Sequence, residues 1–254
     1  MRGLRTAFSI LTVIPLGAAR AGPSPSPGDL ARCAPFFPVV GACLGGALAL
    51  ANHLLSPLLP GQVTAALLVL LAWALTGGIH LDGLADTTDG LASRAPAARA
   101  LEIMRDPRVG AVGAAAAFFA ILLKYATLAA LPPAPRTLAL LLMPAVGRQA
   151  MVTVMPFYRY PREVPGLASP FAGRVSRGEA ALALAITSLL VVAACLGYPR
   201  QAPALCTGAG LGLVASPVAA GLLARRLGGL TGDVYGALCE LAETVFLLAV
   251  VTLA

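Results

Sequence analysis

Apolar residues fill long stretches that recur along the whole chain, and polar residues gather in the short gaps between them. A helix needs about 20 apolar residues to cross a membrane, and these stretches are close to that length. We expect seven spans, with six to eight as the range because Gly and Pro blur several boundaries. The spans lie near residues 36–58, 62–79, 110–131, 136–155, 180–197, 203–223 and 234–254. The pattern predicts an all-α fold, a polytopic membrane helix bundle in which residues 1–254 form a single domain.

Composition supports this interpretation and excludes several other classes of protein. Of the 254 residues, 58% are hydrophobic and 11% are charged, whereas soluble domains carry about 25% charged residues. A soluble enzyme, a disordered chain and a disulfide scaffold are therefore excluded. The five cysteines form no CxxC pair and are expected to be small apolar fillers. Residues 4–17 pair arginine with a short apolar patch, which predicts an interfacial helix, with a signal peptide as the alternative.

The basic residues indicate how the chain is oriented. With the N-terminus inside, 14 of the 18 Lys and Arg residues fall in inside segments, and only Arg136 and Arg200 fall outside. This positive-inside bias accounts for the net charge of +7, so we expect a lipid bilayer and no nucleic acid as the partner. All acidic residues also fall on the inside face or in the inner half of a span. Because acids contribute little to topology, we expect a charged site at the cytoplasmic surface.

An acidic cluster follows the second predicted span. Asp82, Asp86 and Asp89 are spaced i, i+4 and i+7, which places them on one face of a helix. Three adjacent carboxylates repel one another, and oxygen ligands suit a hard cation such as Mg²⁺. His80 is expected to bind a phosphate or carry a proton, with a structural histidine as the alternative. An ordinary solvated loop is less consistent with the small residues between the acids.

Two further segments carry candidate site residues. Arg105, Asp106 and Arg108 lie just before the third span and suit a phosphate-binding edge, the alternative being a membrane anchor whose Asp caps the next helix. Near the end of the chain, Gly232 and Asp233 open the last span and Glu240 lies deeper in it. Acids inside a span usually mark function. We expect this turn to serve the same site as the acidic cluster. Glu240 should then face the bundle interior, along the wall of a substrate cavity or beside an arginine, with a purely structural ion pair to Arg148 or Lys124 as the alternative.

At these residues the sequence resembles the cobalamin synthase family, adenosylcobinamide-GDP ribazoletransferase. The resemblance rests on HLDGLADTTDGL at 80–91, MRDPRVGAVG at 104–113 and TGDVYGALCELAE at 231–243, with support from TAFSILTVIPLG and FFPVVGACLGG at 36–46. These blocks cover nearly the whole chain in the order of the family. The loop at 156–178 shares only a general Arg-rich character.

The resemblance implies a bacterial or archaeal inner-membrane enzyme that requires Mg²⁺ and has its site on the cytoplasmic side. Such an enzyme joins adenosylcobinamide-GDP to α-ribazole, or to α-ribazole 5′-phosphate, and releases GMP. Asp82, Asp86 and Asp89 would then hold the metal, and Asp89 or His80 would take the hydroxyl proton. Arg94, Arg105 and Arg108 would hold phosphates, and a large corrinoid implies an open cavity facing the cytoplasm. Association with other late cobalamin-pathway enzymes, or with a second copy, is a further expectation.

Two other functions remain as alternatives. The CDP-alcohol phosphotransferase signature fits at Asp86, Asp89, Gly90 and Arg94, but its second half fails. Ile103, Pro107 and Ala111 stand where that signature needs Gly, Asp and Asp. An ion-coupled transporter would place acids near mid-membrane and show inverted repeats, and the sequence shows neither.

Overall fold

The computed structural model describes residues 2–14 and 26–253, and within these ranges every regular element is a helix. Four short or surface elements are α1 (Arg2–Leu11), α2 (Pro27–Ala31), the 3₁₀ helix η1 (Ala34–Phe36) and α6 (Ala97–Ile103). The long helices are α3 (Phe37–Leu55), α4 (Gly61–Thr76), α5 (Ile79–Ala92), α7 (Ala111–Ala130), α8 (Pro133–Val154), α9 (Arg177–Gly197), α10 (Ala202–Leu227) and α11 (Gly232–Leu253). The predicted all-α class is confirmed.

Six helices are long and apolar enough to cross a membrane: α3 with η1, α7, α8, α9, α10 and α11. A seventh candidate joins α4 to α5, and this pair is bent by 88°. The predicted count of about seven spans is therefore confirmed. The second predicted span, 62–79, has its end in the wrong place, because α4 stops at Thr76 and the chain turns through Gly77 and Gly78 at positive φ. Glycine adopts this left-handed backbone without the steric cost of a Cβ.

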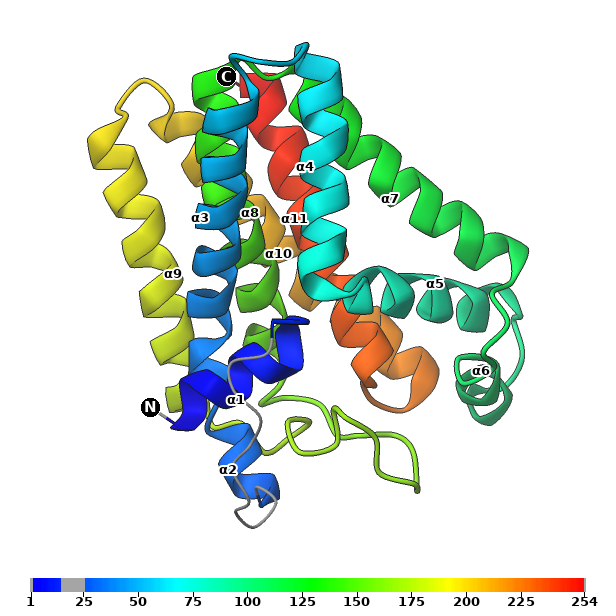
Figure 1. The fold of residues 1–254 in the computed structure, drawn as a ribbon. Coiled ribbons are helices and arrows are strands. Elements are labelled where there is room, and N and C mark those ends of the chain that lie inside the picture. The colour runs from blue at the N-terminus through cyan, green and yellow to red at the C-terminus, as the bar shows by residue number, and fades with distance from the viewer. Residues whose placement is uncertain (1, 15–25, 254) are drawn as a thin grey trace.

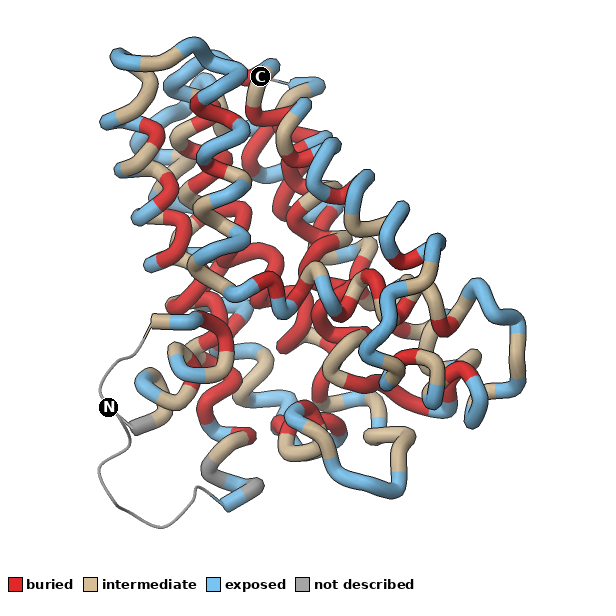
Figure 2. Tube along the Cα trace, turned by 45° about the vertical axis from the view of Figure 1, so that its right-hand side comes forward, coloured by how far each residue is buried: buried red, intermediate tan, exposed pale blue. Residues whose placement is uncertain are grey.

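The bundle is organised around α8, the most buried of the spans. Helix α8 packs extensively against α3 and α11, and α11 also packs along α10 (Figure 1). Figure 2 shows buried residues concentrated along these inner helices and exposed residues on the outer ones. The outward faces carry large apolar side chains, among them Leu50, Phe118, Leu189 and Leu222. Such faces suit contact with lipid rather than with water.

Helix α5 leaves the direction of the bundle and lies across one of its ends. It packs against α11 and α7, and α6 follows beside it (Figure 1). We take α4 as the membrane-spanning part of the bent pair and α5 as lying outside the apolar layer, because α5 carries three aspartates. The same end of the molecule holds α1, α2 and the loop of residues 155–176.

The N-terminal interfacial segment, predicted at 4–17, is only partly described. Helix α1 covers its first part, with Ala7 and Leu11 buried and Arg5 and Ser9 exposed. Residues 15–17 lie outside the described residues. The interfacial role of this helix stays a prediction.

Candidate active site

Helix α5 meets the first turns of α11 at backbone contact. A Cβ added at Gly83 would lie 2.6 Å from the carbonyl oxygen of Asp233, and one added at Gly236 would lie 3.0 Å from the carbonyl oxygen of His80. Only glycine allows two helix backbones to approach this closely. The crossing therefore brings the C-terminal turn and the acidic helix together, as the sequence analysis expected.

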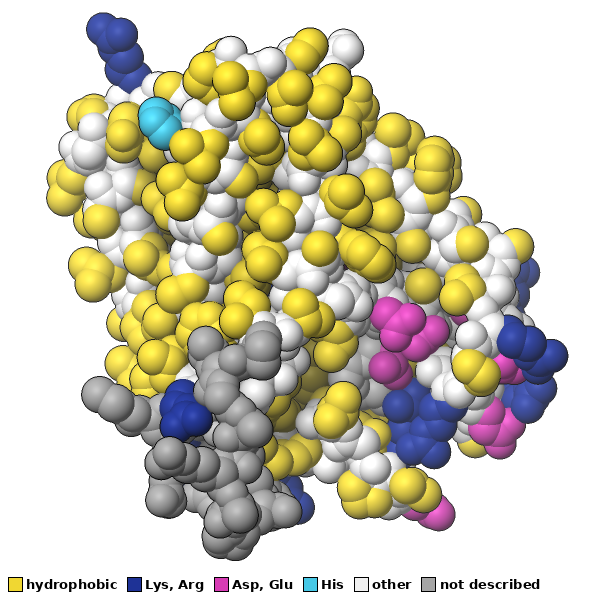
Figure 3. Space-filling model, in the orientation of Figure 1, with side chains coloured by type: hydrophobic (Ala, Val, Ile, Leu, Met, Phe, Trp, Pro, Cys, Tyr) yellow, Lys and Arg dark blue, Asp and Glu magenta, His cyan; other side chains and the backbone are white. Residues whose placement is uncertain are grey.

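The crossing gathers four aspartates at one corner of the molecule. Asp82 is exposed, and Asp86, Asp89 and Asp233 are half-buried. Partial burial, together with the neighbouring carboxylates of Asp82, Asp233 and Asp89, raises the pKa of Asp86 to about 7. Figure 3 shows acidic and basic side chains gathered at the corner of α5 and α6, beneath a largely apolar surface. The four carboxylates therefore repel one another, and a bound cation would stabilise them.

Asp89 has a structural role that its spacing alone did not reveal. Its two carboxylate oxygens accept hydrogen bonds from the backbone N–H groups of Gly110, at 2.7 Å, and Gly113, at 2.8 Å. Helix α7 has no side-chain cap at its own N-cap residue, so Asp89 supplies one from α5. A carboxylate at this position also faces the positive end of the helix dipole. Asp89 thus fixes α5 to the start of α7.

The residues fit a hard divalent cation in chemistry, although they do not form a closed coordination shell. Within residues 2–14 and 26–253, no group of three His, Cys, Asp or Glu side chains lies close enough to hold a metal ion. Asp82 and Asp86 lie one turn apart on α5, and Asp233 joins them from α11. Mg²⁺ is usually held by one or two carboxylates, with water and substrate phosphates completing its shell. The metal roles of Asp82, Asp86 and Asp89 stay predictions.

The three arginines predicted to bind phosphate are all exposed. Arg94 lies two residues after the end of α5 and has a φ of 51°, and Arg105 donates to the carbonyl oxygen of Val164 at 3.2 Å. Arg108 forms a two-point ion pair with Asp106, at 2.9 Å and 2.7 Å. The Arg108 guanidinium lowers the pKa of Asp106 to about 2. Asp106 therefore occupies the guanidinium of Arg108, and it is Asp89 that caps α7.

Arg162 is a site residue that the sequence analysis missed. It belongs to the loop of residues 155–176, where the chain offers no helical periodicity. Its Nη2 donates to Oδ2 of Asp233 at 2.9 Å and to the carbonyl oxygen of Leu101 at 3.4 Å. The hydroxyl of Thr231 donates to the same Asp233 oxygen at 3.2 Å. Asp233 is thus held by a partner from a loop distant in sequence.

Glu240 faces the bundle interior, and its partner is the lysine named in the alternative interpretation. Lys124 Nζ lies 2.8 Å from Glu240 and 2.5 Å from Glu243. Arg148 pairs with the other oxygen of Glu243. All four side chains are buried. Two positive and two negative groups therefore form a balanced charge network between α7, α8 and α11.

His80 belongs to this network rather than to the aspartate face. Nδ1 of His80 lies 3.3 Å from Nη2 of Arg148. An arginine can only donate, so Nδ1 accepts and the proton of a neutral imidazole sits on Nε2. His80 is buried while Asp82 is exposed, which places the two on different faces of α5. The catalytic role of His80 stays a prediction.

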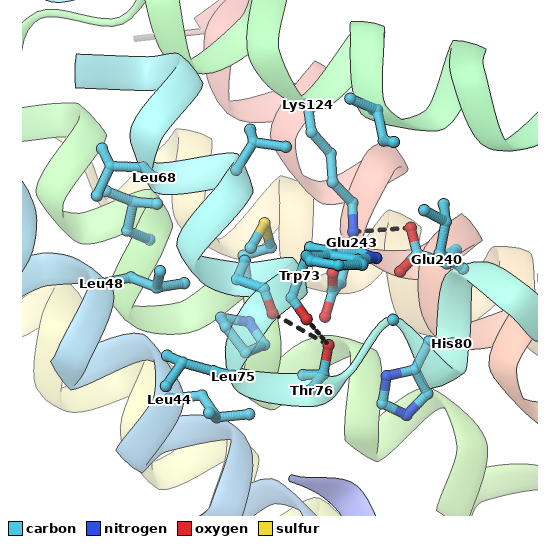
Figure 4. A pocket seen from close by; sticks show the side chains of 18 of the residues that line it. Leu44, Leu48, Leu68, Trp73, Leu75, Thr76, His80, Lys124, Glu240 and Glu243 are labelled. Atoms are coloured by element: carbon cyan, nitrogen blue, oxygen red, sulfur yellow. Dashed lines mark hydrogen bonds and ion pairs between the residues drawn. The ribbon is translucent and has the colours of Figure 1, made fainter. Parts of the chain in front are cut away.

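A small cavity adjoins the charge network (Figure 4). Its volume is about 50 Å³, which is space for water molecules. His80, Lys124, Glu240 and Glu243 line its polar side, and Leu44, Leu48 and Leu68 line its apolar side. This cavity is far too small for the corrinoid chamber that the sequence analysis expected. A second, open hollow of about 460 Å³ lies beside Gly228 and Gly229 and is lined by Arg159 and Arg225.

These features define a polytopic helical membrane protein with aspartates and an arginine assembled at one end of its bundle. Residues 3–251 match the cobalamin-5-phosphate synthase family, and the chain belongs to this family. The match confirms the family that the sequence motifs predicted.

Three proteins are similar to this one over nearly the whole length of the chain. One from Syntrophobacter fumaroxidans is 40% identical over 253 residues, which cover 96% of each chain. One from Desulfitobacterium hafniense is 40% identical over 257 residues, covering 98% of this chain and 96% of its own. One from Desulforamulus reducens is 37% identical over 249 residues, covering 95% and 92%. All three are named adenosylcobinamide-GDP ribazoletransferase, which confirms the predicted enzyme class, a transferase. No solved structure matches the chain.

Proposed function

We propose that this protein joins adenosylcobinamide-GDP to α-ribazole, or to α-ribazole 5′-phosphate, with release of GMP. The product is adenosylcobalamin or its 5′-phosphate. The observation that carries the proposal is the family match over residues 3–251. The names of relatives at 37–40% identity support the same reaction.

The reaction is a displacement at phosphorus. The 3′-hydroxyl oxygen of α-ribazole forms a bond to the phosphorus attached to cobinamide. The P–O bond to the second phosphate breaks, and GMP leaves with the bonding electron pair. Catalysis of phosphoryl transfer depends mainly on positioning and on neutralising charge. A carboxylate of the α5 face would accept the hydroxyl proton through an oxygen that is not bound to the metal, and we assign this task to the exposed Asp82.

Mg²⁺ is part of the proposal. When bound, it would neutralise the charge of the pyrophosphate and stabilise the leaving phosphate. Asp82 and Asp86 would hold it, with Asp233 across the helix crossing. Asp89 would have to share its oxygens with the N–H groups of Gly110 and Gly113. We therefore assign Asp89 chiefly to holding α5 in place.

We place this site on the cytoplasmic side of a bacterial or archaeal inner membrane. The distribution of basic residues supports this orientation. A cysteine introduced at the exposed position 98 of α6 in a cysteine-free variant should resist membrane-impermeant maleimide in intact cells and react after the cells are permeabilised. Ready labelling from outside would reverse the orientation. Association with other cobalamin-pathway enzymes, or with a second copy, stays an expectation.

The other two functions have less support. The CDP-alcohol phosphotransferase signature fails in its second half, where Pro107 and Ala111 replace aspartates. For a transporter, the charge network would have to line a path for ions, but its charges are paired with one another. The family match favours the transferase over both.

The test is a reaction with defined substrates. Purified protein in detergent is incubated with adenosylcobinamide-GDP, α-ribazole and Mg²⁺, and both GMP and the cobalamin product are measured by chromatography. We expect the two products in equal amounts, and loss of both when EDTA removes the metal. Asp82→Asn, which keeps the size of the side chain but removes its charge, should lower turnover by orders of magnitude. Absence of both products with the natural sequence would overturn the proposal.

A further inference from the structure

Arg162 is an unusual arginine for a surface loop. Only 11% of its side chain is exposed, although it belongs to a loop rather than to a span. Both of its hydrogen bonds come from one atom, Nη2. Its Nε is buried and has no hydrogen-bond partner. Guanidinium groups carry five N–H donors in a planar fork, so this one holds donors that the protein does not satisfy.

The loop around Arg162 is anchored rather than free. Leu230 N–H donates to the carbonyl oxygen of Arg159 at 3.0 Å, and Nε of Arg159 donates to the carbonyl oxygen of Gly228 at 3.1 Å. Farther along the loop, Gly173 N–H donates to the carbonyl oxygen of Met155 at 2.8 Å. The first two bonds tie the loop to the turn that opens α11, and the third joins the two ends of the loop. Arg162 is therefore held against the aspartate corner by backbone structure.

The electrostatic surroundings of Arg162 are one-sided. Asp233 pairs with it directly, and its positive charge acts on Asp86 against the effect of the neighbouring carboxylates. The acids that interact at this corner are Asp82, Asp86, Asp89 and Asp233. One guanidinium cannot neutralise four carboxylates. A phosphate would accept hydrogen bonds from the buried donors that have no acceptor. Its counter-cation would neutralise the neighbouring acids.

We propose that Arg162 binds the pyrophosphate of the nucleotide-bearing substrate and gives up part of its bond to Asp233 when it does so. This inference rests on the proposed function and names a ligand of the same site. A planar fork matches two phosphate oxygens at once. Nε and one Nη would face the phosphate, while Asp233 would be released toward the cation. Arg108 is less suited, because Asp106 already occupies its guanidinium.

The test measures GDP binding directly, by equilibrium dialysis of the purified protein with and without Mg²⁺. Arg162→Gln should weaken GDP binding at least tenfold in both conditions. Arg162→Lys keeps the charge but lacks the planar fork, and should recover only part of the affinity. The matched control is Arg174→Gln, an exposed arginine of the same loop, which should bind GDP like the natural sequence.

Asp233→Asn separates ligand binding from a purely structural role. It removes the ion pair but leaves Arg162 in place, so in EDTA this variant should bind GDP at least as tightly as the natural sequence. If Arg162 served only to hold Asp233, Asp233→Asn and Arg162→Gln would lose affinity equally, and the proposal would fail. Natural GDP affinity in folded Arg162→Gln, natural affinity in Arg162→Lys, or no GDP binding by the natural sequence would also overturn it.

Turnover distinguishes this failure from failure of the proposed reaction. Arg162→Gln should raise KM for adenosylcobinamide-GDP and leave KM for α-ribazole unchanged. An active natural enzyme with an unchanged KM in Arg162→Gln would overturn the role of Arg162 alone. If the natural protein is inactive and Arg162→Gln still loses GDP affinity, the reaction is wrong and Arg162 stands as a phosphate ligand.

Discussion

Removing one member of the buried charge network offers a quantitative test of how α7 is held to α11. Lys124→Met keeps the length of the side chain but removes its charge, which leaves Glu240 without its partner at 2.8 Å. Glu243 keeps Arg148. At 2.8 Å and an effective dielectric constant of about 20, Coulomb's law gives about 6 kcal/mol for the lost attraction between Lys124 and Glu240. Breaking a buried pair by removing one partner costs roughly 3–5 kcal/mol. We expect Lys124→Met to lower the free energy of unfolding by about 3–5 kcal/mol.

The double variant Lys124→Met with Glu240→Gln tests whether the cost comes from the unpaired charge. It restores charge balance, because Arg148 and Glu243 still pair. Replacing a buried ion pair as a whole is often nearly neutral, so this variant should regain all but about 1–2 kcal/mol. Leu122→Met is the matched control, because it lies on the same helix with an exposed side chain, and it should change stability by less than about 0.5 kcal/mol.

Unfolding would be followed in mixed micelles by the fluorescence of Trp73, the only tryptophan of the chain, which lines the adjoining cavity. A loss of less than about 1 kcal/mol in Lys124→Met would refute the reasoning based on buried-pair energetics, and so would a double variant no more stable than the single one. The same double variant also resolves the role of Glu240. Turnover in a stable double variant would make Glu240 structural, whereas its loss would retain Glu240 as a residue of the substrate site.

Three further predictions concern α5, its acids and the far end of the bundle. Gly83→Ala should push α5 away from α11, because the added Cβ would lie 2.6 Å from a backbone oxygen, and it should lower both stability and turnover. The control is Gly46→Ala, whose Cβ would meet nothing within 4 Å and which should lower neither. A Gly83→Ala variant as active as Gly46→Ala would exclude the close crossing. In EDTA, Asp86→Asn should stabilise the protein at pH 8 but not at pH 4. The folded pKa of Asp86, about 7, lies above its ordinary value of 3.8, so the natural protein loses stability as pH rises through this window. Thermal unfolding of both proteins at several pH values checks this. A stability difference between Asp86→Asn and the natural protein that does not change with pH would contradict it. Finally, the Sγ atoms of Cys195 and Cys206 lie 3.4 Å apart, so a mild chemical oxidant should join them in a disulfide. Two thiols should then no longer react with an alkylating reagent, and Cys206→Ser should prevent this loss. If both thiols still react after oxidation, α9 and α10 do not pack as described.

Hydrophobic length and charge predicted most of the fold. Spans follow from stretches long enough to cross a bilayer, and this property is local. The bend after Thr76 had a local signal, the pair Gly77 and Gly78, but the apolar pattern continued past it to Ile79. The predicted span therefore ran through the turn.

The site was predictable where it depends on helical spacing and not where it depends on packing. Asp82 and Asp86 share a face because of the helix period. Asp89 has the same spacing, but the unsatisfied N–H groups of α7 occupy its oxygens. The pair Arg162–Asp233 joins segments distant in sequence. Its formation depends on how the loop of residues 155–176 packs against α11, and no spacing within one segment encodes that. Lys124 was one of two candidate partners of Glu240, and only the packing of α7 against α11 selects it.

Helix α5 is held at three points: by Arg148 at His80, by the backbone of α11 at Gly83 and by the start of α7 at Asp89. A helix restrained in this way has little freedom left to lose when a ligand arrives, so binding incurs little entropic penalty for ordering the α5 backbone. The bundle thus holds α5 and its aspartates in a fixed position outside the apolar layer. Selectivity for the substrate then has to come from groups outside α5, namely Arg162 in the loop of residues 155–176 and the surface around α6.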